Sequence, residues 1–204
     1  MGVELVIVPT QWDGIIPALL AGKFDVIIGG MSITPERNLK VNFSDPYAQS
    51  GLLIVANRDE IEKITEDDAD EVDFEDFDDE RVTFAMRRGV TAIDAVNEMF
   101  PEADTRLFDE EATAIQEVVN GNATAWVAAS PSAAVAVSDH GDKLFLPFLE
   151  TFDNTNEGFA LRKNDPDALN FFNNWILTKH ESGWLEERHT YWFKTRQWAS
   201  LVAE

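Results

Sequence analysis

The chain has 204 residues, of which 45% are hydrophobic, and this length can form one sizeable domain or two small lobes. A formal net charge of −22 makes nucleic acid and anionic membrane surfaces unfavourable partners, because like charges repel. The absence of cysteine excludes disulfides, cysteine nucleophiles and thiolate metal sites, and the three scattered histidines have no metal-ligand spacing. We therefore expect no metal and no cofactor.

The first part of the chain alternates short apolar runs with helical periodicity. Residues 3–8 are almost entirely apolar and predict a strand rather than a signal peptide. The expected elements that follow are a helix at 14–21, a strand at 26–28, a short helix at 35–40 and a strand at 52–56.

An acidic tract separates this part from the rest, because residues 66–80 carry eleven acids and no base. A calcium site built from Asp67, Asp68, Asp70, Glu71 and Asp73 is one interpretation. An EF-hand loop also needs a central glycine and a glutamate at its twelfth position, and neither register fits. A solvated, partly mobile loop is the better interpretation.

The second part repeats the alternation of strands and helices. We expect strands at 82–86, 106–108, 125–128, 144–147 and 159–162, and helices at 91–99, 112–120, 131–137, 166–181 and 184–194. Such alternation predicts an α/β fold with mainly parallel sheets and helices on both faces. Because the pattern occurs on both sides of the acidic tract, two lobes are favoured over one sheet. Ligands of such sheets bind beyond the carboxyl ends of the strands.

The turn after residues 26–28 holds the strongest candidate for a ligand contact. Thr34 can cap a helix that begins at Pro35, which places Arg37 in the first helical turn. The helix dipole disfavours a cation there, so an anion is expected nearby. Glu36 is the simple candidate, and a bound carboxylate, which suits the two-pronged guanidinium, is the functional one.

Several motifs, in order along nearly the whole chain, closely resemble the polar amino-acid class of solute-binding proteins. These proteins are the type II periplasmic receptors of ABC importers, also known as bacterial extracellular solute-binding family 3. The most specific motifs are residues 12–19 (WDGIIPAL), 22–25 (GKFD), 30–37 (GMSITPER) and 43–47 (FSDPY). Weaker ones are residues 88–91 (RGVT), 158–163 (GFALRK), 165–167 (DPD) and 173–175 (NNW).

The resemblance implies a periplasmic, two-lobed clamp with two crossing strands as its hinge, which closes on a ligand for the membrane subunits of an ABC importer. Lobe 1 would comprise 1–56 plus 163–204, and lobe 2 would comprise 57–162, including the acidic loop 65–80 and the hinge strands. Carried over by position, Arg37 would hold the ligand α-carboxylate, and Thr91 would close on it from the second lobe. Ser32 and the Gly30 carbonyl would bond its polar end, with Trp12 as a wall.

Two departures from the family pattern matter. Members of the family usually begin with an additional strand and helix, so this chain resembles a first lobe without them, and we expect poor stability or a strand-exchanged oligomer. The family also commonly places an aspartate, for the ligand ammonium, where Ala129 stands. Either the ligand lacks an α-amino group, or another acid such as Glu157 replaces the aspartate.

Simpler interpretations remain for each residue. Without a ligand, the roles would be a surface ion pair of Arg37 with Glu36 or Asp45, a turn hydroxyl for Ser32, a core side chain for Trp12 and a helix cap for Thr91. An aromatic stripe near the end of the chain is expected to pack rather than to bind sugar, and comprises Trp175, Trp184, Tyr191, Trp192, Phe193 and Trp198.

Three functions follow from these patterns. A binding receptor with no catalytic residues is the main prediction. An enzyme similar to the cyclohexadienyl or arogenate dehydratases of the same fold family is an alternative, and it would need a general acid in the cleft. A ligand-sensing domain of a larger receptor is the third.

Overall fold

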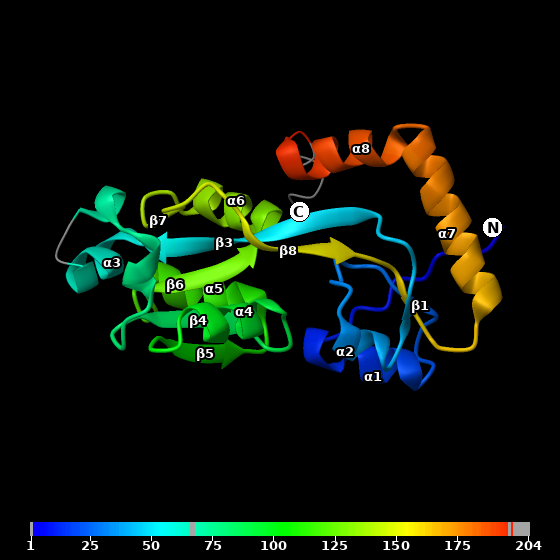
Figure 1. The fold of residues 1–204 in the computed structure, drawn as a ribbon, viewed down its shortest axis with the longest axis horizontal. Helices are drawn as coiled ribbons and strands as arrows, with labels where there is room; N and C mark the ends of the chain where they lie inside the picture. The colour runs from blue at the N-terminus through cyan, green and yellow to red at the C-terminus, as the bar shows by residue number, and fades with distance from the viewer. Residues whose placement is uncertain (1, 66–67, 196, 198–204) are drawn as a thin grey trace.

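The computed structural model describes residues 2–65, 68–195 and 197. Figure 1 shows two lobes, each built around its own sheet, with helices packed against the sheets. The sheet of the small lobe has the order β1 (Val26–Ile27), β9 (Ala160–Leu161), β2 (Asn42–Phe43). The sheet of the large lobe has the order β5 (Asp104–Phe108), β4 (Thr83–Arg87), β6 (Ala125–Ala129), β3 (Ala48–Asn57), β7 (Leu144–Phe145), and β8 (Phe152–Glu157) also pairs with β3. The predicted α/β architecture is confirmed.

The strand directions are mixed, which corrects the expectation of mainly parallel sheets. Strand β4 is parallel to β5 and β6, whereas β3 is antiparallel to β6, β7 and β8. In the small lobe, β9 is antiparallel to both of its neighbours. Parallel neighbours arise from strand–helix–strand crossovers within one lobe. The chain reaches β3 and β9 by passing from one lobe to the other, so no such crossover sets their direction.

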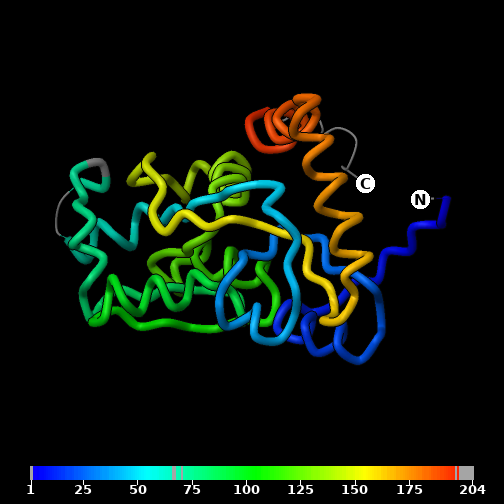
Figure 2. Tube along the Cα trace, turned by 45° about the vertical axis from the view of Figure 1, so that its right-hand side comes forward, coloured from blue at the N-terminus to red at the C-terminus, as the bar shows by residue number. Residues whose placement is uncertain are grey.

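Strands β3 and β8 run side by side from one lobe to the other in Figures 1 and 2. The first half of β3 pairs with β8, and its second half pairs with β6 in the large lobe. The sequence did not predict β8, because its residues are mostly polar. Strand β9 already belongs to the small lobe, so the chain returns there before the boundary expected between residues 162 and 163.

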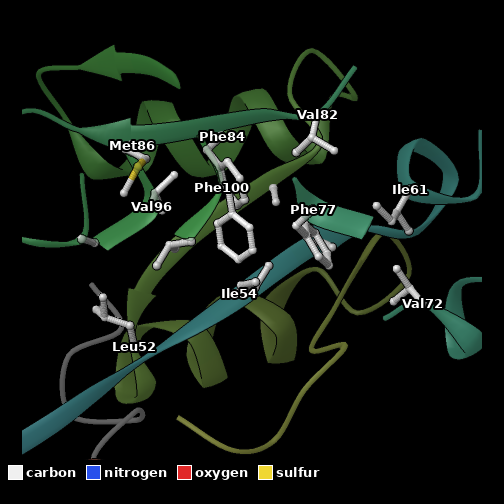
Figure 3. Close-up of a cluster of buried hydrophobic side chains, with 14 of the residues drawn as sticks. Leu52, Ile54, Ile61, Val72, Phe77, Val82, Phe84, Met86, Val96 and Phe100 are labelled. Atoms are coloured by element: carbon white, nitrogen blue, oxygen red, sulfur yellow. The ribbon is translucent and has the colours of Figure 1, made fainter. Parts of the chain in front are cut away.

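Two hydrophobic clusters lie on opposite faces of the large sheet. One joins the sheet to α3 (Arg58–Thr65) and α4 (Ala92–Met99), and Figure 3 shows its interior. The rings of Phe84 and Phe100 stack there with their centroids 5.4 Å apart. The other cluster surrounds Trp126 and is covered by α5 (Glu111–Val119) and α6 (Ser130–Asp139). These cores make the sheet edge that carries the site a rigid platform.

The described part of the acidic tract is more ordered than a solvated loop. It forms two short 3-10 helices, η2 (Ala69–Glu71) and η3 (Phe74–Phe77). Val72 and Phe77 are buried in the core of the large lobe, and the ring of Phe74 lies 4.9 Å from that of Phe100. Apolar residues spaced among the acids therefore attach this tract to the core, which corrects the loop prediction.

The small lobe has a smaller core. Around its sheet lie a 3-10 turn, η1 (Trp12–Gly14), and two short helices, α1 (Ile15–Leu20) and α2 (Pro35–Asn38). One cluster of buried side chains in this lobe comprises Leu19, Ile27, Met31, Val41 and Ala160.

The predicted strand at residues 3–8 is wrong. Most of this segment is unpaired, and it extends away from the small lobe in Figure 2. Leu5 and Ile7 are 77% and 80% exposed. An apolar run becomes a strand only where a neighbouring strand takes its backbone hydrogen bonds, and no described strand lies beside this one.

The last described elements are α7 (Pro166–Glu181), α8 (Trp184–His189) and a π-helical turn, η4 (Thr190–Lys194). Helix α7 packs on Phe159 and Leu161 through Ile176. In the predicted aromatic stripe, the rings of Trp175 and Trp184 pack edge to face at 5.7 Å, whereas Trp198 lies outside the described residues. No helix in the described part of the chain combines the length and the apolar character needed to cross a bilayer.

Candidate functional site

All six residues selected from the sequence line one cavity of about 480 Å³ between the two lobes. The small lobe contributes Trp12, Gly30, Ser32 and Arg37; the crossing strand β8 contributes Glu157; and the start of α4 contributes Thr91. The turn after β1 and the turn after β4 face each other across this cavity. The cavity thus lies beyond the carboxyl ends of strands, where the sequence placed it.

Arg37 is positioned by the start of α2. The Thr34 hydroxyl accepts the Arg37 backbone N–H at 3.2 Å, which confirms the predicted cap. The guanidinium donates from Nη1 to the Ser32 carbonyl at 3.0 Å and from Nη2 to the Gly89 carbonyl at 3.1 Å. Burial lowers the pKa of Arg37, and the charge of Asp94 raises it in part. Among the described residues, no acid forms an ion pair with Arg37, so donors remain for a ligand carboxylate.

Glu157 brings a negative charge into the same cavity. Its side chain is buried, and Oε1 accepts the hydroxyl of Ser50 at 2.6 Å. The backbone of Gly30 passes so close that an added Cβ would lie 3.5 Å from Oε2. Within the described part of the chain, no cation pairs with this carboxylate. A buried carboxylate without a cationic partner is costly unless a bound cation completes it.

Tyr47 connects Glu157 to the turn that carries Gly30. The Tyr47 hydroxyl accepts the Gly30 backbone N–H at 3.0 Å, and its ring stacks on Phe159 at 4.7 Å. Burial raises the pKa of Tyr47 to about 12, with a further contribution from the charge of Glu157. The phenol is therefore neutral at neutral pH.

The lobes touch at the turn that carries Gly89. Its carbonyl accepts both the Arg37 guanidinium and the Trp12 indole N–H, the latter at 3.1 Å. Gly89 has a φ of +79°, and an added Cβ would lie 3.3 Å from the Asp13 Cα. Gln11 also donates to Glu110 across the gap. These contacts hold the two lobes in a closed arrangement.

The remaining predicted groups complete the wall. Thr91 is the N-cap of α4, but its side chain makes no capping hydrogen bond. The Ser32 hydroxyl accepts that of Thr155 at 3.2 Å. Ala129 ends β6 at the cavity and presents only a methyl group.

Residues 1–195 match the family described as bacterial extracellular solute-binding proteins, family 3. The chain belongs to this family. It is 28% identical to the L-cystine-binding protein TcyJ of Escherichia coli (strain K12) over 193 residues, which span 95% of this chain and 69% of that protein.

Two solved structures of related proteins have the same fold. The ancestral amino acid-binding protein AncCDT-1, described as a precursor of cyclohexadienyl dehydratase, is 41% identical with a TM-score of 0.80, over 94% of this chain and 78% of that one. A putative binding component of an ABC transporter from Wolinella succinogenes DSM 1740, complexed with lysine, is 34% identical with a TM-score of 0.86, over 98% and 82%.

Sequence reasoning missed several lining residues of this family-3 solute-binding protein, namely Tyr47, Ser50, Arg87, Glu111, Thr155, His189 and Phe193. The position of Arg87 at the carboxyl end of β4 was a usable signal. Ser50 and Thr155 lie on the two crossing strands, and their contact with the cavity depends on a pairing that the sequence does not reveal. Phe193 is 43% exposed and lines the cavity, and its ring also packs edge to face on His189 at 4.8 Å, in line with the packing predicted for the aromatic stripe.

Proposed function

We propose that this protein is a periplasmic receptor that captures a small amino-acid-like or carboxylate solute between its lobes and presents it to the membrane subunits of an ABC importer. One observation carries this proposal: Arg37 and the buried Glu157 line the same cavity at the place where the lobes meet. Opposite charges in one enclosed site suit a zwitterion. The names of the relatives support the same class of ligand.

In this proposal, residues of opposite charge bind the oppositely charged groups of the ligand. The free donors of Arg37 and the Thr91 hydroxyl bind the ligand carboxylate, since a guanidinium matches a carboxylate in two-pronged geometry. Glu157 binds the ammonium and replaces the acid that Ala129 cannot supply. Ser32 and the Gly30 carbonyl bond the polar end.

Closure follows from the placement of these groups. Ligand groups that touch both lobes shift the equilibrium toward the closed state, because only that state makes both sets of contacts. Strands β3 and β8 are the two hinge crossings, and the lobes divide within each of these two strands. Importer subunits would recognise the closed pair of lobes.

A thermal-shift screen with the standard amino acids, their 2-oxo analogues and small dicarboxylates tests the proposal. A ligand at 100 times its dissociation constant adds about 2.7 kcal/mol to the free energy of unfolding, which raises the melting temperature measurably. The hits are then titrated by calorimetry into Glu157→Gln. We expect amino acids to lose affinity and their 2-oxo analogues to keep it.

Glu150→Gln is the matched control, because Glu150 is exposed and outside the cavity. If no member of the panel raises the melting temperature, the proposal is overturned. If Glu157→Gln binds amino acids as tightly as the wild type, the receptor proposal stands, but Glu157 is not the residue that binds the ammonium.

A dehydratase is the second candidate, because a cyclohexadienyl dehydratase of Pseudomonas aeruginosa is 24% identical over 96% of this chain. Among the described acids that line the cavity, Glu157 is the buried one, so its carboxyl group is the candidate general acid for a leaving hydroxyl. Incubation with prephenate or arogenate tests this function. Formation of phenylpyruvate or phenylalanine above the rate in buffer would establish an enzyme, and its absence with tight amino-acid binding supports the receptor. A sensing domain would bind the same ligands and differ only in the protein to which it is joined.

A further inference from the structure

A second guanidinium, that of Arg87, lines the cavity and makes no hydrogen bond with the described residues. Arg87 ends β4, and its guanidinium carbon lies 4.8 Å from the centre of the Trp12 ring. Its Nε is buried without a hydrogen-bond partner among the described residues. Buried donors in folded proteins are nearly always paired, so the described chain leaves this guanidinium incompletely satisfied.

Among the described residues, Glu111 is the ionic partner of Arg87, and its carboxylate lies too far away for a hydrogen bond. Arg87 Nη1 and Glu111 Oε2 are 3.6 Å apart, whereas hydrogen bonds from nitrogen to oxygen span about 2.7–3.2 Å. Both side chains line the cavity. Together they present a row of N–H donors beside a carboxylate acceptor.

The neighbouring Arg88 is an arginine of the same turn whose guanidinium does form hydrogen bonds. Its Nε donates to Asp109 at 3.0 Å, and its Nη2 donates to the Leu107 carbonyl at 3.2 Å. Arg88 is half-exposed and absent from the cavity wall. The lack of hydrogen bonds at the Arg87 guanidinium is therefore not a general feature of this turn.

We propose that Arg87 and Glu111 read the side-chain end of the ligand and select an uncharged group with both an acceptor and a donor, such as a carboxamide or a ureido group. The inference rests on the proposed function, in which Arg37 and Glu157 take the carboxylate and the ammonium. The carbonyl oxygen of a carboxamide accepts from Arg87, and its NH₂ donates to Glu111. A carboxylate end meets repulsion from Glu111, a cationic end meets repulsion from Arg87, and an apolar end leaves both groups unpaired.

Calorimetric titration of L-glutamine, L-glutamate, L-lysine and L-norleucine into the wild type and two variants tests this selection. In the wild type, we expect glutamine to bind at least tenfold more tightly than each of the other three. Arg87→Met should reduce the advantage of glutamine over norleucine at least tenfold and change norleucine affinity less than threefold. Glu111→Gln should move preference from glutamine toward glutamate, because the repulsion of a second carboxylate is removed.

Arg88→Met is the control and should leave all four affinities unchanged. Circular dichroism melts check that each variant folds. If Arg87→Met does not fold, the shift from glutamine toward glutamate expected for Glu111→Gln still tests the inference. If Arg87→Met lowers the affinity for all four ligands equally, Arg87 contributes only through its contact with Trp12 between the lobes, and the inference is overturned. Wild-type preference for lysine or norleucine would also overturn it while leaving the receptor intact. If the protein binds none of the amino acids and carboxylates of the wider panel, the proposed function itself is wrong.

Discussion

Arg37 carries the main prediction at the scale of single residues. Its guanidinium is fixed by the Ser32 carbonyl within its own lobe and by the Gly89 carbonyl in the closed arrangement, so the remaining donors are oriented toward the ligand. Arg37→Lys keeps the charge but replaces a planar fork by one ammonium, and we expect affinity for carboxylates to fall about tenfold or more. Calorimetry with the tightest ligand of the screen measures this loss. Arg88→Lys is the control, and equal affinity of wild type and Arg37→Lys would show that the fork is not used.

Tyr47 makes a prediction about stability at high pH. Its pKa is raised from the ordinary value of 10.0 to about 12, chiefly by burial, so the folded state holds the proton more tightly than the unfolded state. The resulting stability is complete below pH 10 and is lost as the pH rises through 12, with a total of at most about 3 kcal/mol. Urea denaturation of wild type and Tyr47→Phe at pH 9 and pH 11.5 measures it. The wild type should lose more stability than the variant between these values; parallel losses would contradict the assignment.

The residues of the site were partly predictable. Thr34, Pro35 and Arg37 lie within a few residues of each other, so capping rules and the helix dipole identified them without knowledge of the fold. Arg87 and Tyr47 act through neighbours that are distant in sequence, such as Trp12 and Phe159. Local rules contain no information about such contacts.

At the scale of elements, the turn after β4 controls the contact between the lobes. Gly89 has positive φ and lies against Asp13, so Gly89→Ala strains the backbone and pushes the lobes apart. We expect a loss of roughly 1–2 kcal/mol of stability from the left-handed backbone and a loss of ligand affinity of about tenfold. Denaturation and calorimetry measure the two effects separately.

Gly22→Ala is a matched control for this change. Gly22 has a φ of +72°, close to that of Gly89, and an added Cβ there would meet no atom within 4 Å. Both variants should lose similar stability, and only Gly89→Ala should lose affinity. Equal affinities of the two variants would mean that this turn does not transmit lobe closure.

Element prediction failed where pairing decides the outcome. Residues 3–8 have a stronger strand pattern than 152–157, yet the latter form β8 and most of the former stay unpaired. Strand β8 forms because β3 supplies a partner along its length, and this partner is about a hundred residues earlier in the chain. Helices depend on local hydrogen bonds, which is why α4, α5 and α7 were predicted with small errors at their ends.

At the scale of the whole molecule, residues 3–8 predict self-association. Their extended backbone and exposed apolar side chains can pair with the same segment or a sheet edge of a second copy. Sedimentation velocity should detect oligomers of the wild type that dissociate on dilution, and the double substitution Leu5→Lys, Ile7→Lys should give monomer. Leu149→Lys changes an equally exposed residue elsewhere, 83% exposed, and should have no effect. A wild type that is monomeric at every concentration would exclude this association.

The central claim is that the two lobes enclose a carboxylate ligand on Arg37. The crystal structure of the protein with the tightest ligand of the amino-acid and carboxylate screen tests it most directly. We predict a closed molecule in which a carboxylate oxygen lies within hydrogen-bond distance of the Arg37 guanidinium and of Thr91. A ligand bound outside the cavity lined by Arg37 and Glu157, or one whose carboxylate avoids Arg37, would contradict the account.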